Sequence, residues 1–352
     1  MNAIANFLYG ILSAITGVVQ NHGISIIIFT ILMRLVCAPF DYKSRKGMRK
    51  MSAIQPKLAA LQKKYGNDKQ KYQQKQAELM RKENYNPLSS CLPMLLTWPL
   101  MIAMFTAMRS IANEQLAMQA FRFLAGEENP IQPADVFLWI KNIWMTDSPF
   151  APTVPNAASL GMLTADVWNK VVGLFDAEQM TVILNNIQAA VPEFAGLDFS
   201  TADAMKSSVA AINAALNQIP GYQAAVATVP GWSNLSFILF TITVFVNFNG
   251  LLILPALAGI TQVLQTKFNP QMKEQEQAQA ATSGQKNGTG NFMKYFFPIL
   301  SVFFCLTSNA GFALYWVTSN IVMWVMSIVM TKMLEKQDAK NEAAIAVEGK
   351  IK

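Results

Sequence analysis

The chain has 352 residues, a mean hydropathy of +0.26 and only 14% charged residues, whereas an ordinary soluble domain carries about 25%. A single histidine excludes every multi-histidine metal site and leaves little room for a serine–histidine–aspartate triad. The cysteines Cys37, Cys91 and Cys305 lie in apolar stretches without CxxC spacing, which favours membrane-buried thiols over a disulfide framework. We therefore expect an all-α polytopic membrane protein that is not an enzyme and uses no metal or cofactor.

Residues 1–22 carry no Lys, Arg, Asp or Glu, and apolar side chains such as Phe7, Leu8, Ile11 and Leu12 recur at helical spacing. A signal peptide would need a basic region before its apolar part, and the first charged residue is Arg34. We expect an amphipathic helix on the outer membrane surface. A first transmembrane helix or an uncleaved signal is the alternative.

Five apolar stretches are candidates for membrane-spanning helices: residues 23–41, 88–109, 237–268, 294–309 and 311–332. As one helix, the third would be about 48 Å long, whereas the hydrocarbon core is about 30 Å thick. It must protrude, tilt or break, and residues 247–250 are the expected break, preceded by an apolar extension. The tight turn at 309–311 predicts that the fourth and fifth helices form an antiparallel hairpin.

Charge in the connecting segments predicts the orientation. Residues 41–90 have a net charge of +9 and residues 113–234 have a net charge of −7. Since positively charged loops stay cytoplasmic, the first segment should lie inside and the second outside. The amino terminus is then outside, and the loop 269–293 and the tail 333–352 are cytoplasmic.

The two large connecting segments differ in character. Residues 42–87 divide at a Gly-Asn-Asp turn (66–68) into two expected helices, a basic helical hairpin. This hairpin either simply links two spans or docks on anionic lipid headgroups or ribosomal RNA phosphates. Residues 110–236 form an extracytoplasmic region with an alanine-rich helical insertion near 165–190 and 202–218, whose role the sequence does not reveal.

Arg34 is the one costly residue, because it lies about 10 Å below the cytoplasmic end of its apolar stretch. An arginine near the middle of a bilayer costs about 2.5–3.5 kcal/mol on insertion scales, and no Asp or Glu occurs in another span. We expect the guanidinium to face water or an anionic partner outside this chain, in a hydrophilic groove shared with Thr30, one turn away. The alternative is that Arg34 snorkels to the inner headgroups. Further candidates for the groove are Gln262, Gln265, Ser319 and Asn320.

Several stretches together resemble the YidC/Oxa/Alb family of membrane protein insertases: GISIIIFTILMRLVCAPFDYKS, NPLSSCLPMLLTWPLMIAMF, ILPALAGITQVLQTKFNP and FFPILSVFFCLTSNAGFALYWVTSNI. The resemblance implies a five-span core around a positively charged groove, open to the cytoplasm and lipid, that receives the polar segment of a nascent membrane protein. Arg34, Thr30, Gln265 and Trp316 occupy the positions of groove residues, and the basic hairpin resembles the family's cytoplasmic arm. Nascent membrane proteins and anionic lipids are the implied partners, the ribosome and the Sec translocon are candidates, and DNA is not a partner.

The chain differs from the family pattern in three respects. It lacks the large amino-terminal outer domain and a lipoprotein cysteine, so it resembles the Gram-positive type, and residues 150–236 are an insertion. Residues 332–352 have a net charge of only +1, which gives little support for ribosome binding through the tail. The alternative function is a small-anion transporter or channel with Arg34 as the anion site. It predicts inverted repeats, which the sequence does not display.

Overall fold

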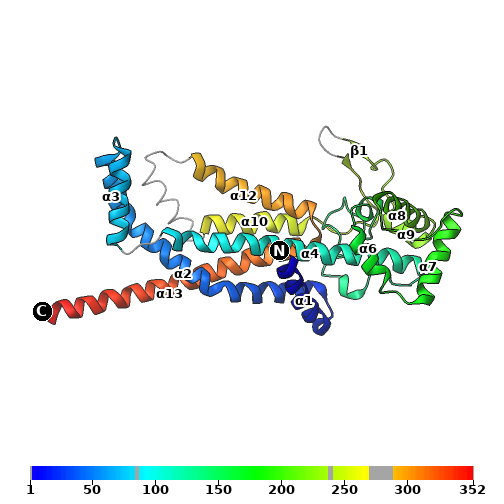
Figure 1. Cartoon of the computed structure of the whole chain (residues 1–352), viewed down its shortest axis with the longest axis horizontal. Coiled ribbons are helices and arrows are strands. Elements are labelled where there is room, and N and C mark those ends of the chain that lie inside the picture. The colour runs from blue at the N-terminus through cyan, green and yellow to red at the C-terminus, as the bar shows by residue number, and fades with distance from the viewer. Residues whose placement is uncertain (1, 84–86, 237–240, 269–287, 352) are drawn as a thin grey trace. The chain divides into compact units, whose positions relative to one another are not determined.

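A computed structural model describes residues 2–83, 87–236, 241–268 and 288–351 (Figure 1). The protein is mostly helical, with 72% helix and almost no strand, as predicted. The helices are α1 (Asn2–Val19), α2 (His22–Tyr65), α3 (Lys69–Lys82), α4 (Pro87–Leu124), η1 (Pro133–Asp135), α5 (Ala157–Leu160), α6 (Ala165–Val172), α7 (Ala177–Ala190), α8 (Ala202–Leu216), α9 (Pro220–Val226), α10 (Ile253–Phe268), α12 (Gly288–Thr307) and α13 (Ala310–Ile351). The strands β1 (Leu235–Ser236) and β2 (Thr241–Ile242) form a small antiparallel pair.

The chain divides into two compact units. Unit 1 contains residues 1–29, 103–256 and 302–316, and unit 2 contains residues 30–102, 257–301 and 317–352. Helices α2, α4, α10, α12 and α13 contribute residues to both units. Among the described residues, His22–Gly47 and Ala310–Lys340 are long and apolar enough to cross a membrane, and Asn6–Val19 and Tyr295–Thr307 are shorter apolar helices.

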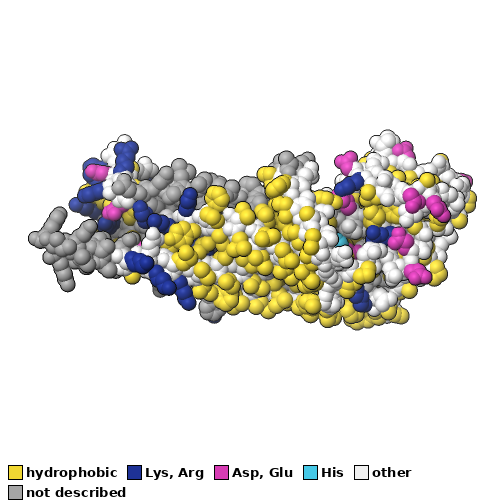
Figure 2. Space-filling view, turned by 90° about the horizontal axis from the view of Figure 1, so that it is seen from below, with side chains coloured by type: hydrophobic (Ala, Val, Ile, Leu, Met, Phe, Trp, Pro, Cys, Tyr) yellow, Lys and Arg dark blue, Asp and Glu magenta, His cyan; other side chains and the backbone are white. Residues whose placement is uncertain are grey.

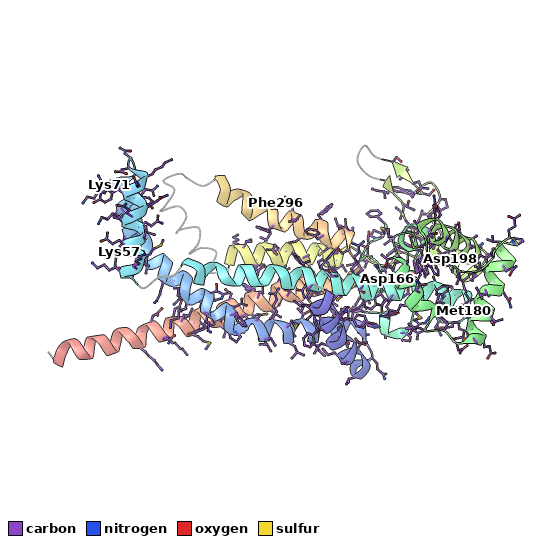
Figure 3. All side chains as sticks on the ribbon, in the orientation of Figure 1. Lys57, Lys71, Asp166, Met180, Asp198 and Phe296 are labelled. Carbon is purple, nitrogen blue, oxygen red and sulfur yellow. The ribbon has the colours of Figure 1, made fainter. Side chains whose placement is uncertain are left out.

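Unit 1 has a core of its own in the alanine-rich region, where α6 to α9 pack around the end of α4 (Figure 1). The indole of Trp168 is fully buried and stacks on Phe199, with ring centroids 5.5 Å apart. Phe121 meets the Trp168 ring edge to face at 5.6 Å. The polar residues Asp166 and Asp198 lie on this part of the chain with Met180 of α7 (Figure 3). Aromatic burial of this kind gives the inserted region an ordinary hydrophobic core.

Helix α1 carries both buried and exposed apolar side chains. Leu8 and Leu12 are buried, whereas Phe7 is 67% exposed and Val18 is 85% exposed. The exposed apolar side chains are typical of a helix that meets another apolar phase.

Two hydrogen bonds to one carboxylate link α1 to α4 and α6. The Tyr9 hydroxyl donates a 3.0 Å hydrogen bond to Glu114, and Lys170 donates one of 2.7 Å to the same carboxylate. Burial, together with the negative charge of Glu114, raises the pKa of Tyr9.

The prediction of a helix over residues 237–268 is wrong for the first part of this range, because the described residues from 241 to 252 are not helical. Residues 241–242 form β2, and the following backbone pairs with distant segments. Val244 donates to the Trp232 carbonyl at 2.9 Å and Val246 donates to the Ala227 carbonyl at 2.8 Å. An apolar run of this length fits a strand as well as a helix, and here the extended form satisfies its backbone in the insertion. Residues 237–240 lie outside the described part.

Buried polar side chains organise the irregular segment that joins α4 to the insertion. Asn142 and Asn249 exchange hydrogen bonds of 2.8 Å between backbone and side chain. The Asp135 carboxylate accepts from the Trp144 indole at 2.6 Å and lies 3.0 Å from the His22 ring. The single histidine is thus a structural contact at the start of α2. Such contacts give hydrogen-bond partners to buried backbone and side-chain groups that have none in a helix or sheet.

In unit 2, α2 continues without interruption from its apolar part into its basic part, although it contains Pro39 and Pro56. Large apolar side chains on the two longest helices remain exposed within the unit: Ile31, Leu32, Leu35, Val36 and Phe40 of α2, and Ile321, Val325, Val329 and Met333 of α13. Figure 2 shows an extensive surface of hydrophobic side chains with the Lys and Arg side chains gathered beyond it. A soluble protein rarely exposes so large an apolar surface.

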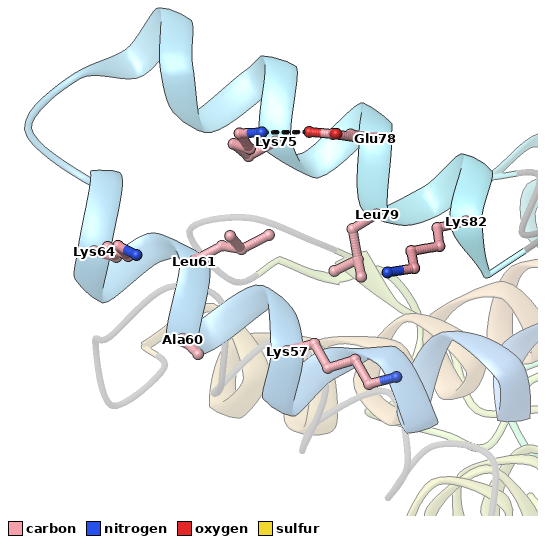
Figure 4. Close-up of a pocket in the computed structure, with 8 residues that line it drawn as sticks. All are labelled: Lys57, Ala60, Leu61, Lys64, Lys75, Glu78, Leu79 and Lys82. Carbon is pink, nitrogen blue, oxygen red and sulfur yellow. Dashed lines mark hydrogen bonds and ion pairs between the residues drawn. The ribbon is translucent and has the colours of Figure 1, made fainter.

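Helix α3 folds back beside the end of α2 and forms a helical hairpin (Figure 4). Ile54 and Leu58 are buried against Leu79 and Met80. The Asp68 carboxylate caps α3 by accepting a 3.0 Å hydrogen bond from the Lys71 amide. The turn between the two helices therefore lies where the Gly-Asn-Asp motif predicts it.

Candidate polar groove in unit 2

Arg34 lies on the apolar part of α2 and points toward α13. Its Nε–H donates a 2.9 Å hydrogen bond to Ser319 Oγ, and its Nη2 contacts the same oxygen. The Arg34 side chain is partly exposed, and within the described residues no carboxylate forms an ion pair with it. The guanidinium therefore has a hydroxyl partner inside the chain and no carboxylate at ion-pair distance among the described residues, while Asp41 of the same helix attracts it at longer range.

Other polar side chains of unit 2 connect the neighbouring helices. Asn320, beside Ser319 on α13, donates a 3.2 Å hydrogen bond to Thr261 of α10. Thr30, one turn before Arg34, is fully buried. Three apolar helices thus carry hydroxyl and amide groups at their contacts, as polar residues between membrane helices commonly do.

The glutamines of α10 occupy two different environments. Gln262 accepts a long hydrogen bond of 3.5 Å from Ser301 of α12, so it forms a contact between helices. Gln265 is 9% exposed, and its amide makes no side-chain hydrogen bond to the described residues. Of the two, Gln265 has the greater capacity left for a ligand.

Trp316 belongs to unit 1. Its ring lies 5.7 Å from that of Phe312 and 6.5 Å from that of Phe304. The indole N–H is buried and has no hydrogen-bond partner in the described part of the chain. The structure therefore describes Trp316 as part of an aromatic cluster, separately from Arg34 and Gln265.

Polar contacts continue along α2 and α13 beyond their apolar parts. Arg45 donates to Ser327 at 2.8 Å, and Arg49 donates to Asp338 at 2.9 Å. Contacts advance along both helices in the same direction, so within unit 2 the two helices run parallel. Sequence reasoning missed these pairs and also Thr261 and Ser301. The sequence did offer one indication of the Arg49 contact. Glu335 and Asp338 in the tail are three positions apart, so they share one helix face and could pair with a basic side chain.

The chemistry offered by this cluster is electrostatic and hydrogen-bonding. Arg34 contacts one hydroxyl group, and further hydroxyl and amide groups lie at the other contacts between these helices. Among the described residues no group of three His, Cys, Asp or Glu could hold a metal ion. Such a cluster lowers the cost of placing a polar or negatively charged group within an apolar helix assembly.

The helical hairpin carries a second, more strongly basic surface. An open cavity of ≈440 Å³ between its helices is lined by lysines and apolar side chains: Lys57, Ala60, Leu61, Lys64, Lys75, Glu78, Leu79 and Lys82 (Figure 4). Lys75 pairs with Glu78 at 2.6 Å and Lys57 pairs with Glu83. Lys57 and Lys71 mark the two helices of the hairpin in Figure 3.

Comparison with known proteins assigns the chain to a family. The family described as 60Kd inner membrane protein matches residues 14–202 and 210–338, which is most of the chain. The chain belongs to this family. The resemblance to YidC/Oxa/Alb proteins that the motifs indicate is thereby confirmed.

Curated relatives carry the name membrane protein insertase YidC. The relative from Aeromonas hydrophila is 34% identical over 160 residues, which is 46% of this chain and 26% of the relative. Those from Clostridium tetani and Fusobacterium nucleatum are 37% and 41% identical over 31% of this chain and 52% and 53% of the relatives. The matched segments thus span between a quarter and about half of the length of these relatives.

Proposed function

We propose that the protein is a membrane protein insertase, and that it acts by electrostatics and hydration without covalent catalysis. Membership of a family whose curated relatives are named insertases supports this proposal. The observation that carries it is Arg34, a cation on an apolar helix that has a hydroxyl partner but no carboxylate partner in the described part of the chain.

In the proposed mechanism the groove receives the polar outer segment of a nascent membrane protein. Moving one aspartate to the bilayer centre costs about 2.5–3.5 kcal/mol. An arginine about 4 Å away contributes about 4 kcal/mol of attraction at an effective dielectric constant of 20. One guanidinium therefore offsets the cost of about one client carboxylate, while Thr30, Gln262 and Gln265 supply hydrogen-bonding partners. Trp316 is proposed to contact the client's apolar helix before it enters the lipid.

The proposed topology has five spans, with the amino terminus outside and the tail in the cytoplasm of a bacterial cell. Charge asymmetry between residues 41–90 and 113–234 supports this arrangement. The parallel course of α2 and α13 agrees with it, because the first and fifth of five spans cross in the same direction. At about 66 Å, a 44-residue α2 is long enough to cross the bilayer and continue into the basic hairpin.

The proposed partners follow from the same charges. Nascent membrane proteins are the clients, and the basic hairpin faces anionic lipid headgroups, the ribosome or the Sec translocon on the cytoplasmic side. The outer insertion is proposed to cap the spans on the opposite side, with α1 on the membrane surface.

The proposal is tested with purified protein in liposomes. A short client with one aspartate in its outer segment is synthesised in the presence of these liposomes, and insertion is measured by protease protection. We expect protection that falls at least fivefold with empty liposomes or with a client whose aspartate is replaced by arginine. Equal protection in all cases would contradict the proposal, and chloride flux through the same liposomes without client insertion would favour the anion channel.

A further inference from the structure

A second polar cavity, of ≈360 Å³, lies within unit 1. Its wall is built by α4, by the segment around Trp144 and by the turn between α12 and α13. The lining residues are Phe105, Arg109, Ala112, Asn113, Leu116, Trp144, Met145, Thr146, Ser159, Met162, Phe304, Thr307, Ser308, Asn309 and Phe312. A volume in this range suits a small organic group or a lipid headgroup.

Arg109 is the only charged residue among the described residues of this lining, and it is exposed. In the described part of the chain its guanidinium makes no hydrogen bond or ion pair, and neither do the side chains of Asn113 and Ser308. The side-chain oxygen Oδ1 of Asn309 accepts a 2.8 Å hydrogen bond from the Phe312 amide, which leaves the side-chain NH₂ group of Asn309 as a donor. The cavity therefore has donors on α4 and on the turn, together with one positive charge.

The Trp144 indole and the hydroxyls of Ser159 and Thr307, which also line the cavity, already have partners. The Trp144 indole donates to Asp135 at 2.6 Å, and the Ser159 hydroxyl donates to the Asn156 carbonyl at 2.9 Å. Thr307 donates to the Phe303 carbonyl of its own helix at 3.0 Å. None of the described lining residues carries a carboxylate. Unused donors beside one arginine are the arrangement that binds an anion with several oxygens.

Aromatic side chains also line the cavity. Phe105 and Phe312 meet edge to face with centroids 5.1 Å apart, and Phe304 lines the same cavity. Phe105 precedes Arg109 by one helical turn, so the two side chains share a face of α4. In the proposed topology Arg109 ends the second span on its outer side. The anion should thus be attached to an apolar body that lies along the span.

We infer that this cavity binds the phosphodiester headgroup of an anionic phospholipid of the outer leaflet. The Arg109 guanidinium bonds two phosphate oxygens, and Asn113, Ser308 and Asn309 donate to the remaining oxygens. The glycerol and acyl chains pass along Phe105, Phe304 and Phe312 into the bilayer. An anionic headgroup is preferred because it places no second cation beside Arg109. This inference rests on the proposed topology but not on the proposed groove.

Native mass spectrometry of the full chain, released from nanodiscs of equal phosphatidylglycerol and phosphatidylcholine, tests the inference. We expect at least one retained phosphatidylglycerol per chain. Arg109→Gln should lower the retained fraction roughly tenfold, since a charge-assisted pair is lost. Asn113→Leu should lower it less. Lys206→Gln removes an exposed cation from the same unit outside the cavity and should change nothing. Far-ultraviolet circular dichroism should show that every variant is folded.

Three results would overturn the inference. Phosphatidylglycerol could be absent from the unaltered chain, or Arg109→Gln could retain as much as the unaltered chain. Inorganic phosphate at millimolar concentration could displace the lipid completely, which would indicate a site for free phosphate. The Arg34→Ala variant separates this inference from the proposed function, because it should lose insertion and keep the lipid.

Discussion

Arg34 of α2 donates a 2.9 Å hydrogen bond to Ser319 of α13, so the one cation within the first apolar stretch is held by a neutral side chain. A hydroxyl fixes the guanidinium without neutralising it. A carboxylate at the same place would form an ion pair and compete with an acidic client. The positive charge is therefore positioned by the chain and remains available for a negative partner.

Replacing Ser319 with alanine should affect the position of the Arg34 guanidinium more than it affects client insertion. We expect Ser319→Ala to lower the free energy of unfolding by about 1–2 kcal/mol, because one hydrogen bond to a charged donor is lost. Insertion should persist at a reduced rate. Thermal unfolding in detergent and the protease-protection assay measure the two effects, and Ser319→Thr serves as the control that keeps the hydroxyl. Complete loss of insertion in a folded Ser319→Ala protein would show that the hydroxyl itself is essential.

The start of α10 depends on the buried carboxylate of Asp147. It accepts hydrogen bonds from the amides of Leu251 and Leu254 at 2.8 and 2.7 Å. Asp147→Ala should cost about 2 kcal/mol of stability, since these amides at a helix start lose their acceptor. Thermal unfolding compares it with Asp166→Ala, which removes an exposed carboxylate of α6. Equal melting temperatures of the two variants would contradict this role.

The helical hairpin should open when its small core is truncated. Leu58 is fully buried against Leu79 and Met80, and a buried Leu→Ala change costs about 2–5 kcal/mol. We expect Leu58→Ala to speed amide hydrogen exchange throughout α3 and to leave exchange in α7 unchanged. Lys63→Ala, at an exposed position of the same helix, should leave α3 as it is. Unchanged exchange in α3 with Leu58→Ala would mean that the hairpin is held by other contacts.

The insertion in unit 1 should lose stability at high pH. Burial raises the pKa of Tyr222 to about 12, whereas an unfolded tyrosine has a pKa of about 10. Because the folded-state pKa is the higher one, this stabilisation is complete below about pH 10 and is lost as the pH rises through about 12. The loss should reach about 2–3 kcal/mol. About half of this loss, about 1.4 kcal/mol, should be present at pH 11, and thermal unfolding at pH 8 and pH 11 measures it.

Tyr222→Phe is the matched variant for the pH experiment. It removes the titrating hydroxyl and also its 2.9 Å hydrogen bond to the Pro155 carbonyl. We expect it to be less stable than the unaltered chain at pH 8 and to show a smaller decline toward pH 11. The same decline in both proteins would assign the pH dependence to other groups.

Much of the fold follows from patterns along the chain, because each apolar stretch has helical spacing and each turn has Gly, Asn or Asp. Arg34 stands out for the same reason, as a charge in an apolar context. The break expected at residues 247–250 lies close to the start of α10 at Ile253, but the extended course of residues 241–252 could not be predicted, since this run is as compatible with a strand as with a helix. Their partners, such as the Trp232 carbonyl, are fixed only in three dimensions.

Site residues whose contacts come from neighbouring helices could not be predicted from the sequence either. Ser319 was one candidate among several, and only the folded chain pairs it with Arg34. Arg109 attracts no attention in the sequence because it lies at the end of an apolar stretch. Its significance comes from its neighbours in the cavity, which are Asn113 on α4 and Ser308 and Asn309 in the turn between α12 and α13. The two segments are far apart in sequence and line one cavity.

The most direct test of the central claim is rescue of an insertase-depleted bacterium by the unaltered chain and by Arg34→Lys, Arg34→Ala and Arg34→Glu at matched membrane levels. The account predicts growth with the unaltered chain, partial growth with Arg34→Lys, and failure with Arg34→Ala and Arg34→Glu. Growth with all four would contradict an electrostatic groove and reduce Arg34 to a residue that snorkels to the headgroups. Failure of the unaltered chain despite correct membrane integration would contradict the insertase function in that host.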